Sequence, residues 1–150
     1  MFLRILSLLF VLSLVTVPFD LGAQDQKVTY KKARALQTST AKKIVKVVEA
    51  LERVDEEGKE DPDFETVKEI LNELLDKKDS LRSYDRSVMW NYWGYVYWSE
   101  ERFSDAMRAY RNLLAEPEST IPLRVASLYT LAQLNFVNED YEEGVKVLLQ

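Results

Sequence analysis

The sequence predicts an all-α fold in which about three antiparallel helix pairs stack in chain order as a solenoid. Apolar residues recur at helical spacing along most of the chain after residue 33. Short loops containing Gly, Pro or runs of acidic residues separate these segments. Phe64, Phe103 and Tyr141 each open the second helix of a pair and recur at nearly equal intervals along the chain. A fixed period of this kind is typical of helical repeat proteins.

The N-terminus has the pattern of a secretory signal peptide. Arg4 precedes an apolar run over 5–17, and Leu21-Gly22-Ala23 offers a small-residue cleavage site. The run of about 13 residues is shorter than the roughly 20 that span a bilayer. We expect a cleaved signal over 1–23 and a flexible leader over 24–32. An uncleaved anchor is the alternative, because Leu21 is larger than the residue preferred at that position.

The first helix pair is predicted on either side of an acidic loop. The helical pattern starts at Ala33, and its apolar stripe consists of Ile44, Val47, Val48 and Leu51. The loop over 55–63 contains Gly58 and Pro62, which end the first helix. The second helix is expected from Phe64 to about Lys78.

Two further pairs follow the same plan. We expect helices over 84–99, 104–115 and 123–137, and a sixth helix that begins near Tyr141. The loop over 116–122 contains two prolines, which separate the second pair from the third.

The aromatic segment from Trp90 to Trp98 carries the most specific pattern. Its helical stripe and the residues that follow are Trp90, Trp93, Gly94, Tyr97, Phe103, Ala106, Ala109, Tyr110 and Pro117. This order resembles the tetratricopeptide repeat, with Trp93 at the usual Leu position. The resemblance is clearest over 87–117. It is weaker over 125–150, where Asn135 replaces Tyr97, and weakest over 38–78, which we interpret as a divergent unit.

The resemblance also implies where a partner binds. In tetratricopeptide folds the equivalent face of each first helix lines a concave groove that holds a peptide or a helix. The residues at these positions are Asn91, Tyr95, Trp98, Tyr129, Gln133 and Phe136. We expect Trp90, Trp93 and Tyr97 to pack inside the pair instead, against Phe103, Ala106 and Tyr110. In the alternative, further C-terminal helices or the leader fill the groove.

Composition argues against several kinds of chemistry. The chain has neither Cys nor His, so it lacks the residues of the commonest zinc sites and of Ser-His or Cys-His nucleophiles. The acidic loop fails the calcium pattern, because Gly58 would place Arg53 at the first ligand position. With a net charge of −5 the chain has no basic face for nucleic acid. We therefore expect no catalytic residues, no metal, no cofactor and no nucleic-acid partner.

The end of the sequence is apolar. Val145, Leu148 and Leu149 fall in the sixth helix, and no polar capping helix follows them. We expect either that this is part of a longer repeat array or that the apolar end packs against a second copy.

The third unit suggests a narrower relationship. The segment 126–136 with Glu139-Asp140-Tyr141 resembles exported tetratricopeptide proteins of gammaproteobacteria that accompany TonB–ExbB–ExbD systems. That resemblance implies a periplasmic protein and an accessory role in TonB-dependent transport. The sequence thus predicts a non-catalytic module that binds a protein or peptide, without a stable membrane span after signal cleavage. The alternatives are a self-associating scaffold, or the interaction part of a longer protein whose activity lies beyond residue 150.

Overall fold

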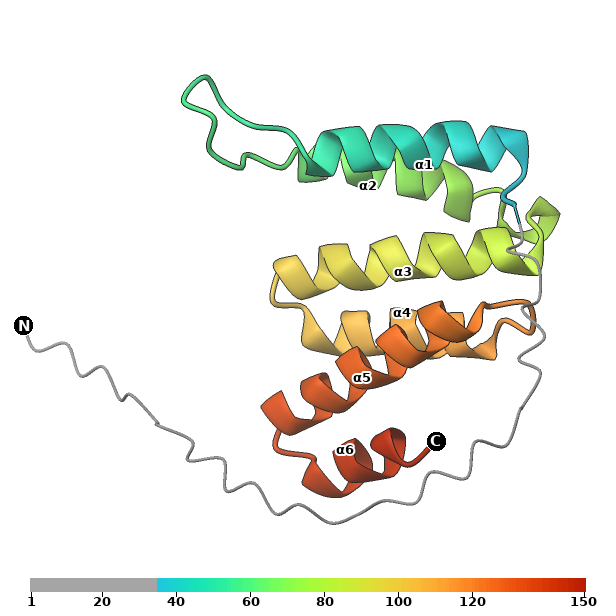
Figure 1. Cartoon of the computed structure of the whole chain (residues 1–150), viewed down its shortest axis with the longest axis vertical. Helices are drawn as coiled ribbons and strands as arrows, with labels where there is room; N and C mark the ends of the chain where they lie inside the picture. The colour runs from blue at the N-terminus through green and yellow to red at the C-terminus, as the bar shows by residue number, and fades with distance from the viewer. Residues whose placement is uncertain (1–34) are drawn as a thin grey trace, which may run out of the picture. The chain divides into compact units, whose positions relative to one another are not determined.

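The computed structural model describes residues 35–150, so the predicted signal and leader lie outside the described residues. Within 35–150 no helix has the length and apolarity needed to cross a membrane. The described elements are all helical: α1 (Thr38–Leu51), α2 (Phe64–Leu75), the 3-10 helix η1 (Lys78–Ser80), α3 (Ser83–Ser99), α4 (Phe103–Ala115), α5 (Ile121–Val137) and α6 (Tyr141–Leu148). Figure 1 shows the six α-helices following one another in chain order from α1 to α6. The predicted all-α class and the helix pairs are confirmed.

The pairs form because each helix buries one side against its sequence neighbours. The contacts join α1 to α2, α3 to α4 and α5 to α6, and further contacts join α2 to α3 and α4 to α5. In α1, Ile44, Val47 and Ala50 are buried at spacings of three residues, which place them on one face. Most helical stability comes from burying such a face rather than from intrinsic propensity.

The loop between α1 and α2 is a small, ordered acidic hairpin. Val54 and Glu60 form an isolated antiparallel bridge. The Asp55 carboxylate accepts hydrogen bonds from the backbone N–H groups of Glu57 and Lys59, each at 2.9 Å. Gly58 has φ +79°, a conformation that favours glycine. These bonds order the loop, which projects beyond the ends of α1 and α2 in Figure 1.

The turns that join α3 to α4 and α5 to α6 have the same geometry. Glu101 and Glu139 adopt positive φ values of 58° and 62°. The next N–H group reaches back to the first helix in both turns, from Arg102 to the Tyr97 carbonyl and from Asp140 to the Asn135 carbonyl, each at 2.8 Å. This is the Schellman arrangement, which satisfies the last carbonyls of a helix. The interval between the two turns equals the interval between the starts of α4 and α6, so the repeat period is present in the backbone itself.

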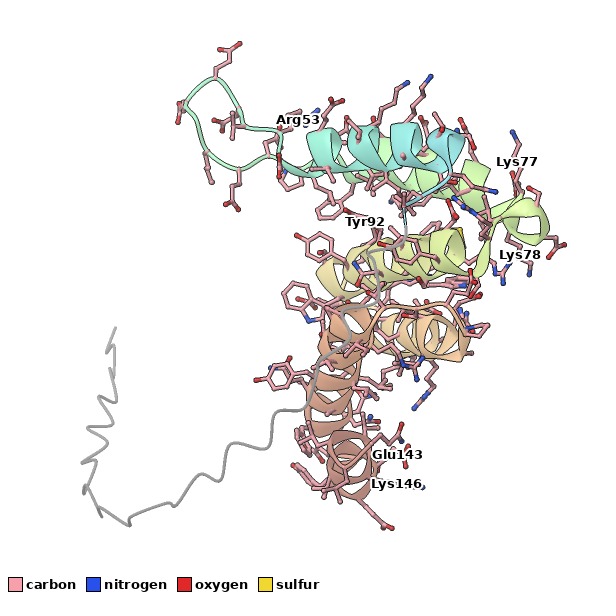
Figure 2. The ribbon with its side chains drawn as sticks, turned by 45° about the vertical axis from the view of Figure 1, so that its right-hand side comes forward. Arg53, Lys77, Lys78, Tyr92, Glu143 and Lys146 are labelled. Carbon is pink, nitrogen blue, oxygen red and sulfur yellow. The ribbon has the colours of Figure 1, made fainter. Side chains whose placement is uncertain are left out.

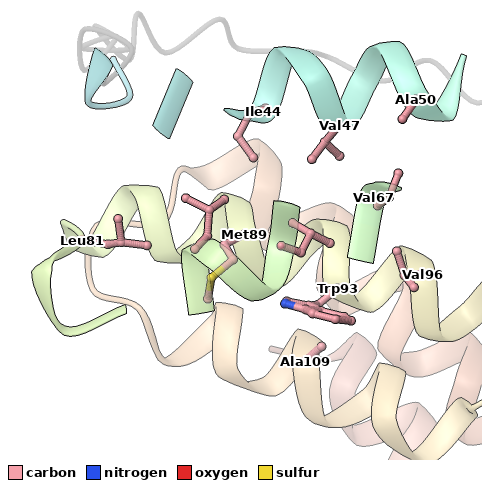
Figure 3. Packing of buried hydrophobic residues seen from close by; sticks show 11 residues of the cluster. Ile44, Val47, Ala50, Val67, Leu81, Met89, Trp93, Val96 and Ala109 are labelled. Carbon is pink, nitrogen blue, oxygen red and sulfur yellow. The ribbon is translucent and has the colours of Figure 1, made fainter. Parts of the chain in front are cut away.

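The core consists of two clusters. In the first, residues of α1, α2 and α3 surround Trp93, which lies against Ala109 of α4 (Figure 3). The second joins Ala106, Met107, Tyr110, Leu131, Ala132, Leu134 and Val147. Tyr97 packs against both clusters and stacks on Trp93 with ring centroids 5.0 Å apart.

This division changes the predicted packing of the aromatic segment. Trp93 is buried as expected, but it belongs to the first cluster and not to the one that contains Ala106 and Tyr110. Tyr97 does pack against the cluster with Ala106 and Tyr110, as predicted. Trp90 and Tyr97 are only partly buried. The reason is that α3 contacts both α2 and α4, so the side of α3 that bears Trp93 is shared between two pairs.

Candidate protein-binding surface

A stripe of uncharged side chains runs along the outer side of α3. Tyr84, Val88, Asn91, Tyr95 and Trp98 recur at alternating steps of four and three residues, which keeps them on one side of a helix. Tyr95 is 40% exposed and Trp98 is 50% exposed. Tyr84, Val88 and Asn91 are partly buried, and Val88 packs against the first core cluster. Tyr95 and Trp98 therefore lie at the surface and not inside the helix pair, as their spacing predicted, and their place in a concave groove stays a prediction.

The exposed rings of α3 continue onto α2. Tyr95 and Trp98 stack with ring centroids 6.3 Å apart, and the centroid of the Phe64 ring also lies 6.3 Å from that of Tyr95. Phe64 opens α2 and belongs to the first helix pair. The sequence did not predict that Phe64 contributes to this surface. Its recurrence with Phe103 and Tyr141 indicated only that the three residues occupy equivalent positions in the three helix pairs.

The matching stripe on α5 is also uncharged. Tyr129 is 60% exposed, and Gln133 is exposed as well. Pro122 and Ala126 extend the stripe toward the start of α5, again with alternating steps of four and three residues. Each of these positions lies one repeat period after its counterpart on α3.

Phe136 departs from the predicted arrangement. It stands one repeat period after Trp98, yet it is only partly exposed. Its ring covers Gly144 of α6, where an added Cβ would lie 2.4 Å from a ring carbon. Ala106, the counterpart of Gly144, carries that Cβ. The missing Cβ lets Phe136 settle against α6, and Phe136 also stacks on Tyr141 with centroids 6.4 Å apart.

All three charged side chains of α3 and α5 are turned toward neighbouring elements. Asp85 is fully buried and accepts a 2.8 Å bond from the Gln37 N–H. Arg86 donates two bonds to the Glu116 carboxylate, at 2.7 and 2.8 Å. Arg124 donates to the Leu114 carbonyl at 2.7 Å. The charges thus take no part in the outer stripes.

We call these two stripes, together with the exposed apolar residues that flank them on α5, the uncharged face. Its members are Tyr84, Val88, Asn91, Tyr95 and Trp98 of α3 and Ile121, Pro122, Val125, Ala126, Tyr129, Gln133 and Val137 of α5. The outer positions of α4 and α6, by contrast, include Arg108, Arg111, Glu142 and Lys146.

Tyr92 and Tyr110 keep their hydroxyl protons across the physiological pH range. Burial raises the pKa of Tyr110 to about 12, with a smaller contribution from Tyr95. Burial also raises the pKa of Tyr92, helped by the charge of Glu52.

Two hollows elsewhere differ from the uncharged face in chemistry. One, of about 360 Å³, is lined by Trp90, Arg86, Lys78 and Glu116 among others. The second, of about 500 Å³, adjoins the N-terminus of α1. Among residues 35–150 no group of three or more acidic side chains is placed to hold a metal ion.

The geometry of the uncharged face suits burial against another apolar surface. Tyr and Trp rings bring large apolar area at small conformational cost and retain a polar group at the edge. Exposed apolar patches of this kind mark sites of association. Comparisons of the chain with protein-family profiles, with curated proteins and with solved structures found no match.

Proposed function

We propose that this chain is a non-catalytic binding module whose uncharged face takes a peptide or helix of another protein. The observation that carries the proposal is the orientation of the charges: Asp85, Arg86 and Arg124 all bond to neighbouring elements. The outer faces of α3 and α5 are left with rings, aliphatic groups and amides. Surface helices of soluble proteins ordinarily place charges there.

The chemistry of the face defines the partner. A segment with apolar side chains would bury the rings of Tyr95, Trp98 and Tyr129. The amides of Asn91 and Gln133 offer hydrogen bonds to its backbone or to polar groups between the apolar ones. Recognition of a helix in an apolar groove typically uses such anchors at spacings of three and four residues. A highly charged partner would lose solvation without gaining a counter-charge.

The tetratricopeptide resemblance supports the same function, and the N-terminal pattern supports its location. We propose that the module acts in the periplasm, exported by residues 1–23, as an accessory of TonB-dependent transport. Cell fractionation with mass spectrometry of the mature N-terminus tests this separately. Export with cleavage after Ala23 is the expected result, and a cytoplasmic chain that still begins at Met1 contradicts it.

One observation favours self-association as a second candidate. Ile121, Val145, Leu148 and Leu149 expose between 51% and 82% of their surface near the α5–α6 end. A second copy docking there would bury them. This candidate predicts a concentration-dependent mass in sedimentation or light scattering. The binding-module proposal predicts a constant mass.

The proposal is tested by affinity capture with three forms of the protein. Each form is incubated with the same cell extract, and the captured proteins are quantified by mass spectrometry. The three forms are wild type, Tyr95→Ala/Trp98→Ala and Val54→Ala. Val54 is the matched control, because it is an apolar side chain with 54% exposure that lies in the hairpin. We expect one partner to bind wild type and the Val54 variant and to be lost from the double variant.

The purified partner then decides the outcome. Removing a central aromatic anchor weakens an interface by about 2 kcal/mol or more, equivalent to roughly a thirtyfold rise in Kd. Equal affinity of the partner for wild type and the double variant would place binding away from the uncharged face. Circular dichroism and melting curves establish that both variants are folded.

A further inference from the structure

The hollow at the start of α1 has the chemistry of an anion site. It measures about 500 Å³, and we call it the α1 cavity. Its lining consists of Gln37, Thr38, Ser39, Thr40, Lys43, Leu74, Lys77, Ser80 and Leu81. Four of these residues carry hydroxyl groups and two carry ammonium groups, whereas the apolar part is limited to two leucines.

Backbone donors open onto this cavity. The first helical hydrogen bond of α1 runs from the Ala41 N–H to the Gln37 carbonyl at 2.8 Å. The preceding N–H groups, of Thr38, Ser39 and Thr40, have no acceptor among the described residues, and no side chain caps the helix. Unpaired N–H groups at a helix N-terminus carry partial positive charge and favour an anion.

Thr40 supplies a separate observation. The residue is fully buried, it lines the α1 cavity, and its Oγ1 has no hydrogen-bond partner. Because Cα–Cβ bonds on a helix lean toward its N-terminus, the Thr40 side chain leans toward the end of α1 at which the cavity lies. A buried hydroxyl without a partner is unfavourable, and an acceptor bound in the cavity would remove that cost.

The charges around the cavity favour an anion over a cation. Lys43 and Lys77 lie in its lining, and Arg82 lies nearby, donating to the Ala35 carbonyl and to Asp85. The lining itself contains two cations and no carboxylate. Of the carboxylates bonded to these cations and to Arg82, Glu73 is paired with Lys43 and Asp85 with Arg82. Lys77 forms no ion pair within residues 35–150.

We propose that the α1 cavity binds a phosphate group through the N-terminal N–H groups of α1, the Thr40 hydroxyl and Lys77. A tetrahedral oxyanion presents acceptors in several directions, which matches donors that converge from a helix end, hydroxyls and an ammonium. The lining has no aromatic ring on which a nucleobase could stack. The recognised chemistry is therefore the phosphate group itself, free or as a small monoester.

Amide NMR of the protein during titration with sodium phosphate tests this. Sodium chloride at the same ionic strength is the reference. We expect the amide resonances of Thr38, Ser39 and Thr40 to shift saturably with phosphate and not with chloride. Phosphoserine is titrated in parallel: tighter binding than inorganic phosphate identifies a monoester as the ligand, and weaker or equal binding identifies the free ion. Linear shifts that chloride reproduces overturn the proposal.

Three substitutions separate binding from folding. Thr38→Pro removes one N–H from the first helical position, and Gln37, at φ −59° and ψ 143°, already has the conformation that must precede proline. Lys77→Gln removes a charge, and Thr40→Val replaces the hydroxyl by a methyl group. We expect Lys77→Gln to weaken phosphate binding at least about tenfold, as for loss of a charge-assisted hydrogen bond.

Lys78→Gln is the matched control, since Lys78 is adjacent in sequence but lines the other hollow. Figure 2 shows Lys77 on the α1 side and Lys78 on the α3 side of the chain after α2. We expect Lys78→Gln to bind phosphate as wild type does. Thr40→Val should melt at a higher temperature without phosphate and gain less from adding it. Wild-type affinity in both Lys77→Gln and Thr38→Pro would show that the donors named here do not hold the ion.

Discussion

The ring of Tyr110 lies directly over Gly94, so closely that an added Cβ would come within 2.6 Å of the ring. Tyr110 is 6% exposed and packs in the second core cluster. It therefore cannot swing aside. The approach of α4 to α3 depends on the absence of a side chain at this one position, because any Cβ would separate the two helices.

Gly94→Ala should lower the free energy of unfolding by about 1–2 kcal/mol. Overpacking costs roughly 1–3 kcal/mol, and the higher helix propensity of Ala recovers up to about 1 kcal/mol. Urea unfolding measures the change. Gly144→Ala is the comparison, since its Cβ would meet the ring of the partly exposed Phe136, which can rotate outward. A larger loss in Gly144→Ala than in Gly94→Ala would contradict this view of the two contacts.

Glu101→Gly should stabilise the protein by about 0.5–1 kcal/mol. Glu101 adopts φ 58°, and the left-handed conformation costs a non-glycine residue roughly 1–2 kcal/mol, part of which is offset by the greater flexibility of Gly in the unfolded chain. Glu139→Gly should behave alike. Asn138→Gly is the control, because Asn138 has φ −81°. Stabilisation by all three substitutions would mean that the effect does not come from the left-handed conformation.

Stability should fall in acid partly through Asp63, which caps α2. The Thr66 N–H donates to its carboxylate at 3.0 Å and the Thr66 hydroxyl at 2.9 Å. These bonds, backbone first, lower the pKa of Asp63 below its ordinary value of 3.8, and Arg53 contributes. The folded-state pKa is the lower one, so the contribution is complete above the unfolded pKa and is lost as the pH falls through the folded value.

Asp63→Asn isolates this contribution, because the amide oxygen still caps the helix but does not titrate. Unfolding in urea from pH 6 to pH 2 should show a shallower acid loss than in wild type. Some acid loss should remain, because hydrogen bonds from Lys43 and Lys68 lower the pKa values of Glu73 and Glu100 respectively. An unchanged pH profile would rule out the proposed role of Asp63.

Trp93 should contribute mainly to folding stability, whereas Trp98 should contribute mainly to partner binding. Trp93 is 5% exposed, and Trp93→Ala should cost about 3–5 kcal/mol of unfolding free energy. Trp98 is 50% exposed, and Trp98→Ala should cost less than about 1 kcal/mol while weakening partner binding. Thermal melts of both variants measure the difference. Similar losses of stability would mean that α3 is rotated from the orientation described here.

The helices were largely predictable because apolar spacing and turn residues agree along the chain. The start of α2 at Phe64 and of α6 at Tyr141, and the ends of α3, α4 and α5, fall where the pattern placed them. The start of α5 was predicted two residues late, because Pro122 was interpreted as a loop residue. Proline is accommodated in a first helical turn, where its missing N–H has no partner to lose. The region after Leu75 forms η1 instead of continuing α2 to Lys78.

The surface was only partly predictable, since spacing fixes which side of a helix a residue occupies but not what covers it. Tyr95, Trp98, Tyr129 and Gln133 lie outward as their spacing predicts. Phe136 shares that spacing, but its exposure depends on Gly144, which lies on another helix. The burial of Asp85 likewise depends on a distant N–H, that of Gln37. Such contacts are set by tertiary packing, which no local pattern reports.

Photo-crosslinking from single positions is the most direct test of the uncharged face. A photoreactive amino acid is placed at 98, at 129 or at 54, and the products formed in cells of the source organism are identified by mass spectrometry. We predict that positions 98 and 129 capture the same partner protein and that position 54, in the hairpin, does not. Capture of that partner from position 54 alone, or only of a second copy of the chain from 98 and 129, would contradict the account.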